Sequence, residues 1–122
     1  MDTNTIALDQ GLFEMANLEP EKTGVDGFVY VSTAVARHGP RVKYFRKLGK
    51  GQPSLSVSIA DAPEILVSSL SQAETDRYAP QVIDFVLHNR ERLLDFWAHG
   101  TEWPSDQVHA FLNSFARAPG RP

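Results

Sequence analysis

The stretch SQAETDRYAPQVIDFVLHNRERLLDFWAHG, residues 71–100, carries the strongest secondary-structure signal in the chain. Ser71 and Glu74 form the S-x-x-E pattern of a capping box, in which each side chain bonds the other residue's backbone N–H at the start of a helix. Proline has no amide proton to donate, so Pro80 predicts a kink, or a split into helices over residues 72–79 and 80–99. Gly100 suits the position just after the helix. A broad apolar stripe recurs at helical spacing and comprises Val82, Ile83, Val86, Leu87, Leu93, Leu94, Phe96 and Trp97.

The segments before this helix have the composition of β-strands. Residues 27–36, GFVYVSTAVA, are rich in β-branched and aromatic side chains, and residues 54–59, SLSVSI, alternate strictly between serine and apolar residues. Residues 41–48, RVKYFRKL, alternate in part, with Lys43 and Tyr44 on opposite faces. Residues 64–68, EILVS, indicate a fourth short strand. Short connections between these strands favour an antiparallel meander.

The predicted fold class is therefore α+β, with a three- to four-stranded antiparallel meander packed on a long kinked helix plus one shorter terminal helix. The shorter helix should have Ser105 as its N-cap and run to residue 116, because Val108, Phe111, Leu112 and Phe115 lie on one seam.

The length of 122 residues suits a single core. We expect an acidic N-terminal arm over residues 1–26, docking through Leu12 and Phe13, a single domain over residues 27–117, and a disordered tail over residues 118–122. The sequence contains no cysteine and no run of 18 apolar residues, which excludes disulfides, thiolate metal sites and a membrane-spanning helix. It predicts a cytoplasmic protein that uses no cofactor and does not associate with membranes.

The net charge of -3 is unevenly distributed. Residues 1–26 hold six acidic residues and one basic residue, and residues 61–122 hold nine acidic and five basic residues, whereas residues 27–60 hold six basic residues and no acidic one. A cationic strand with interleaved aromatic rings can contact phosphates and stack on bases, or meet an acidic protein. An alternative is that these cations protect an edge strand and pair with the acidic arm. The predicted binding residues are Arg37, Arg41, Lys43, Tyr44, Arg46, Lys47 and Lys50.

Other candidate sites are weaker. Asp84, His88, Asp95 and His99 lie at spacings that share one helix face, but Arg92 in their midst opposes a metal ion, and we predict neither a metal site nor a catalytic group there. Aromatic residues near the end of the long helix could instead anchor a homo-oligomer. The interface residues predicted on this basis are Trp103 and Phe111.

The order of these strands, followed by a helix with Asn89-Arg90-Glu91, Leu93-Leu94 and Trp97, resembles the small bacterial proteins grouped as Domain of Unknown Function 4160, over residues 27–97. Members of that family carry an H-x-H segment after a proline. Arg41 and Lys43 occupy those places here, so the role of the histidine pair does not carry over. The resemblance implies a small sheet-plus-helix domain, associated with toxin–antitoxin pairs and without an established activity.

Two classes of function follow. The first is a non-enzymatic bacterial regulatory module, toxin–antitoxin-like, that binds an acidic protein or nucleic acid through its basic strand. The alternative is a metal-independent RNA-processing enzyme with His38 or His88 as general base.

Overall fold

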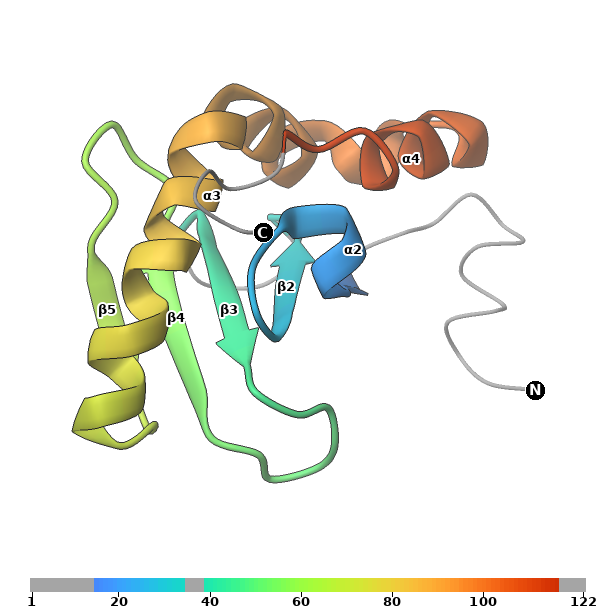
Figure 1. Cartoon of the computed structure of the whole chain (residues 1–122). Helices are drawn as coiled ribbons and strands as arrows, with labels where there is room; N and C mark the ends of the chain where they lie inside the picture. Colours follow the sequence, from blue (N-terminus) through green and yellow to red (C-terminus); the bar gives the residue numbers. More distant parts are fainter. Residues whose placement is uncertain (1–14, 35–38, 117–122) are drawn as a thin grey trace.

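The computed structural model describes residues 15–34 and 39–116, which form one sheet and a helical layer (Figure 1). Each strand pairs antiparallel with its neighbour in the chain, giving the order β1-β2-β3-β4-β5. The predicted α+β class and antiparallel meander are confirmed, although the sheet has five strands. The elements are β1 (Met15–Leu18), α2 (Pro20–Thr23), β2 (Phe28–Ser32), β3 (Arg41–Phe45), β4 (Ser54–Ser58), β5 (Ile65–Ser68), α3 (Gln72–His99), the 3-10 turn η1 (Gly100–Glu102) and α4 (Ser105–Leu112).

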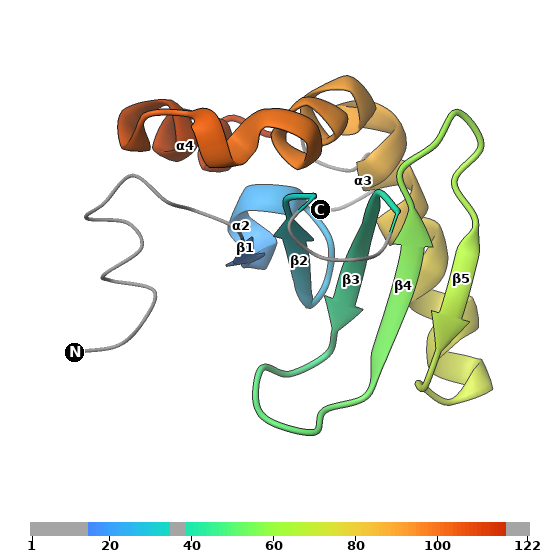
Figure 2. The same ribbon diagram turned by 180° about the vertical axis from the view of Figure 1, so that it is seen from behind.

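The long helix α3 covers one face of the sheet, as Figure 1 shows for β4 and β5. Alternate residues of the three central strands face this helix and are fully buried, because a strand turns successive side chains to opposite faces. Figure 2, from behind, shows β3, β4 and β5 in front of α3 with no helix over them. The sheet side of the core comprises Val29, Val31, Val42, Tyr44, Leu55 and Val57, and α3 contributes Tyr78, Val82, Phe85, Val86, Leu93 and Phe96.

The predicted capping box begins α3. Ser71 Oγ accepts from the Glu74 amide at 3.1 Å, and the Glu74 carboxylate accepts from the Ser71 amide at 3.4 Å. The helix then runs as one element through Pro80, so the alternative of two separate helices is wrong. Gly100 has a helical φ of -58° rather than a left-handed one, and the chain continues directly into η1.

The N-terminal segment joins the sheet earlier than expected. From Met15 the chain forms β1, which pairs with β2 and buries Leu18. Within the segment predicted as an acidic arm, Pro20–Thr23 form the short helix α2, which ends at Gly24 in a left-handed conformation with φ 77°. Docking through Leu12 and Phe13, and the tail over residues 118–122, lie outside the described residues.

The last helix, α4, is shorter than predicted, and Pro104 rather than Ser105 occupies its N-cap. Its apolar residues pack on the C-terminal part of α3, where the Phe111 and Phe96 rings stack with centroids 4.7 Å apart. None of the helices in the described part of the chain is long and apolar enough to cross a membrane.

Candidate functional site

The side chains of β2, β3 and β4 that point away from α3 form what we call the open face: Phe28, Tyr30, Ser32, Arg41, Lys43, Phe45, Ser54, Ser56 and Ser58. All but Ser56 retain partial exposure, whereas the residues that alternate with them are fully buried. The strand register places Lys43 directly between Tyr30 and Ser56, and Phe45 directly between Phe28 and Ser54. Rings, a cation and hydroxyls therefore lie side by side on three adjacent strands.

The charge of this face is of one sign. None of the five strands contains an aspartate or glutamate, and the only basic residues on the strands, Arg41 and Lys43, both lie on the open face. The other layer has the opposite balance, because α3 carries five carboxylates against three guanidinium groups. The two cations of the open face thus have no carboxylate on any strand, in a protein whose net charge is -3.

Arg41 has an unsatisfied donor. Its Nε is buried and has no hydrogen-bond partner among the described residues. The other arginines of the described chain contact carboxylates, carbonyls or rings, as with Arg90, which pairs with Asp61 at 3.1 Å. A buried donor that lacks a partner has a free-energy cost of about 1–3 kcal/mol.

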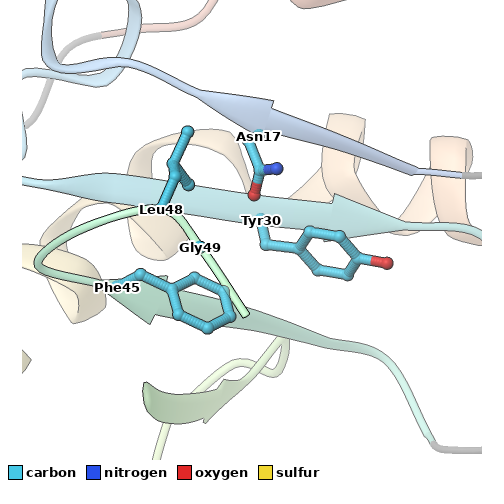
Figure 3. A pocket seen from close by; sticks show the side chains of 5 residues that line it. All are labelled: Asn17, Tyr30, Phe45, Leu48 and Gly49. Atoms are coloured by element: carbon cyan, nitrogen blue, oxygen red, sulfur yellow. The ribbon is translucent and has the colours of Figure 1, made fainter. Parts of the chain in front are cut away.

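A shallow pocket of about 140 Å³ lies on the open face, where the connection between β3 and β4 folds back over the sheet (Figure 3). Tyr30 and Phe45 extend into it from adjacent strands, and Asn17 of β1 lies at its margin. Leu48 and Gly49 reach it from the hairpin, and Gly49 has φ +140°, a conformation that favours glycine. The Tyr30 hydroxyl donates to Met15 Sδ at 2.8 Å.

None of the five pocket residues was among the predicted binding residues. The alternation of residues 28–32 already separates Phe28 and Tyr30 from the buried Val29 and Val31. The contribution of Leu48 and Gly49 could not be predicted from nearby sequence, because the connection that carries them reaches the pocket only in the folded chain.

Two predicted binding residues face the opposite side. Tyr44 has no exposed surface, stacks on Tyr78 with ring centroids 5.5 Å apart, and donates a hydrogen bond to the Asp26 carbonyl. Arg46 donates to the same carbonyl at 2.9 Å, forms an ion pair with the Asp26 carboxylate at 3.3 Å, and lies 4.2 Å over the Tyr78 ring. Tyr44 therefore belongs to the core rather than to an exposed surface, and Arg46 lies on the helix side of the sheet, away from the open face. A binding role for Arg46 stays a prediction.

Burial raises the pKa of the Tyr44 hydroxyl from its ordinary value of 10.0 to about 12. The hydrogen bond from Arg46 lowers this pKa, but burial has the larger effect. The phenol is neutral at physiological pH and acts as both donor and acceptor.

The remaining predicted cations differ in position. Lys47 and Lys50 are exposed in the connection between β3 and β4, close in sequence to the pocket residues Leu48 and Gly49. Arg37 lies outside the described residues.

The polar stripe on α3 offers no reactive site. His88 is exposed, and its Nδ1 lies 2.7 Å from the Asp84 carbonyl. The described residues contain no group of three histidines or carboxylates placed to hold a metal ion. His88 also lies on the helical layer, on the other side of the sheet from Lys43. A role for His88 as a general base stays a prediction. His38, the other predicted general base, lies outside the described residues.

The predicted oligomer contact is largely internal. Phe111 is only 6% exposed and its ring packs against Phe96, Trp103 and Phe115, so it belongs to the core of this chain. Trp103 is partly exposed beside a groove of about 260 Å³ between α3 and α4. An interface role for Trp103 stays a prediction.

Comparison of the chain with protein-family models, with curated proteins and with solved structures finds no match. The resemblance to Domain of Unknown Function 4160 therefore stays a prediction.

Proposed function

We propose that this protein is a non-catalytic binding module that accepts an anionic macromolecule on the open face of its sheet. The observation that supports this function is the pairing of Arg41 and Lys43 on a sheet face whose strands carry no carboxylate. Charges grouped in this way create a local positive potential that attracts anions, even when the whole protein is acidic.

The position of β3 argues against a purely protective role for these cations. Basic residues on exposed edge strands prevent unwanted pairing with other chains. However, β3 is the central strand and pairs on both sides, with β2 and with β4. The edge strands β1 and β5 carry no basic residue at all. The cations are therefore found where edge protection does not require them.

The partial burial of Arg41 and Lys43 gives further support. It lowers the solvation of the two cations, which strengthens their attraction to an incoming anion. Binding of an anionic regulatory partner, such as an acidic protein or a nucleic acid, requires no catalytic group in the described chain.

Binding of two labelled anionic probes, a polyglutamate peptide and a single-stranded oligonucleotide, would test this function by fluorescence anisotropy at low salt. The double variant Arg41→Glu/Lys43→Glu should lose binding of every probe that the natural chain binds. The matched control is Arg77→Glu/Arg90→Glu, which changes the net charge equally but alters the helical layer. Circular dichroism and thermal unfolding would establish that each variant folds, and Lys43→Glu alone would replace the double variant if Arg41 proves necessary for folding.

Failure of the natural chain to bind either probe would refute the proposed function. Equal loss of binding in the two double variants would refute it as well, because the effect would then follow net charge rather than the open face.

A further inference from the structure

We infer that the anionic partner is a single-stranded nucleic acid, with one base stacked at the pocket between Tyr30 and Phe45 and the backbone passing over Lys43 and Arg41. This inference rests on the proposed function and specifies the chemistry of the partner. It separates nucleic acid from acidic protein, since both would be attracted by the same charges.

The aromatic residues distinguish the two partners. Phe28 and Phe45 are direct register partners on β2 and β3, and Tyr30 lies two residues further along β2 on the same face. Planar rings on the outer face of a sheet are the surface on which unpaired bases stack, and every base has a flat face to offer. An acidic peptide gains little from such rings, because its carboxylates are attracted by the cations alone.

The cations lie within reach of this stack. Lys43 faces Tyr30 directly across the strands and is two residues from Phe45, or about 6.6 Å along the strand. Arg41 follows two residues further on the same face, so successive phosphates could meet the two cations in turn. A guanidinium is planar and can bond two phosphate oxygens at once, and the Arg41 side chain is partly exposed on this face.

The serines of β4 complete the surface without selecting a sequence. Ser54, Ser56 and Ser58 lie opposite Phe45, Lys43 and Arg41 respectively. Their hydroxyls can contact sugar or phosphate oxygens, which are the same for every nucleotide. Stacking needs unpaired bases, which a duplex does not offer along its length. We therefore expect selectivity for single strands over duplexes, with little preference among sequences.

The central experiment compares a labelled oligo(dT) of about eight nucleotides, within the range of about 4–16 nucleotides bound by small single-strand-binding folds, with an abasic strand of the same length and with a duplex. The natural chain should bind oligo(dT) at least about 5-fold more tightly than either of the others, because the stacking of a single base contributes at least that factor. Anisotropy at increasing salt measures the affinities and the number of phosphate contacts.

Two variants of one residue separate ring stacking from simple apolar contact. Phe45→Leu keeps an apolar side chain but removes the ring, and it should weaken oligo(dT) binding about 5-fold or more while leaving the affinity for the abasic strand unchanged. Phe45→Tyr keeps the ring and should bind oligo(dT) as the natural chain does. Lys43→Gln should reduce the slope of log affinity against log salt by about 0.7, the value for one phosphate on a single strand.

Failure of this inference can be distinguished from failure of the proposed function. Binding of polyglutamate through Arg41 and Lys43 without binding of oligo(dT) would overturn the inference and leave the binding module intact. Equal affinity for oligo(dT), the abasic strand and the duplex would overturn it too, because phosphates alone would then account for recognition. Absence of binding to any anionic probe would overturn both.

Discussion

The side-chain amide of Asn89 bonds both backbone groups of Ala116, which lies 27 residues later in the chain. Nδ2 donates to the Ala116 carbonyl at 2.8 Å, and Oδ1 accepts from the Ala116 amide at 2.9 Å. Nδ2 also donates to the Phe85 carbonyl within α3 at 2.9 Å. Asn89 is buried in the middle of α3, so it fastens the segment after α4 to the long helix.

Replacement of Asn89 by alanine should lower the free energy of unfolding by about 2 kcal/mol, because the variant loses two hydrogen bonds to the Ala116 backbone and one to the Phe85 carbonyl. Urea denaturation would measure the loss, and amide hydrogen exchange at Ala116 should accelerate. Asn113→Ala is the matched control, since Asn113 is exposed and its side chain bonds only the His109 carbonyl within its own turn. An equal loss of stability in the two variants would contradict this role for Asn89.

Replacement of Arg46 by alanine should cost about 1–3 kcal/mol of stability, because its guanidinium bonds the Asp26 carbonyl and the Tyr44 hydroxyl and stacks on Tyr78. Thermal and urea unfolding would measure the change. The neighbouring Lys47→Ala removes the same charge from an exposed position and should change stability by less than about 0.5 kcal/mol. If Arg46→Ala proved neutral for stability but impaired partner binding, the assignment of Arg46 to the helix side would be wrong.

Tyr44 should make stability depend on pH in the alkaline range. Its folded pKa of about 12 lies above its ordinary value of 10.0, so the folded chain binds the phenol proton more tightly than the unfolded chain. This contribution is fully present below about pH 10 and is lost as the pH rises through about 12. Tyr44→Phe should be less stable at neutral pH by about 1–2 kcal/mol, because it loses hydrogen bonds with Asp26 and Arg46.

The stability difference between the natural chain and Tyr44→Phe should therefore shrink from pH 10 to pH 12. Urea midpoints for the two proteins across this range provide the measurement, and groups that titrate alike in both cancel in the difference. Curves that stay parallel would show that the Tyr44 proton is not held more tightly in the folded chain.

Replacement of Gly100 by alanine should destabilise the fold by about 1–3 kcal/mol, although alanine favours helical conformations. A Cβ at this position would lie 2.6 Å from Phe96 Cδ1 and 3.0 Å from Thr33 Cγ2. The backbone conformation is helical, so crowding rather than φ excludes the side chain. Gly39→Ala is the control, because a Cβ there meets nothing within 4 Å, and a similar loss in both variants would argue against the steric explanation.

The elements predicted most closely are those that form through interactions between residues close together in the sequence. The capping box at Ser71 and Glu74 involves residues three apart, and the stripe on α3 repeats every turn, so both could be recognised without the fold. The alternation of β4 likewise separated its serines from Leu55 and Val57. β1 was missed because its sequence, MANL, has no β-branched residue, and its strand conformation comes from pairing with β2.

The candidate site was predicted only in part, since a basic strand does not reveal which of its cations share a surface. Alternation places Lys43 and Arg46 on opposite faces, but the role of Arg46 depends on Asp26 and Tyr78, which lie far from it in sequence. The structure does not support the protective role expected for an edge strand either, because β3 pairs with β2 on one side and with β4 on the other.

By itself, the sequence determined where α3 begins, which residues of each strand are apolar, and that positive charge is concentrated in residues 27–60. These properties depend on a residue and its near neighbours. Only the tertiary structure decided that Arg41 and Lys43 share a face without carboxylates, that the connection between β3 and β4 folds back to form a pocket beside Phe45, and that Asn89 holds Ala116. Each of these requires the approach of segments distant in sequence, and packing against the rest of the chain determines that approach.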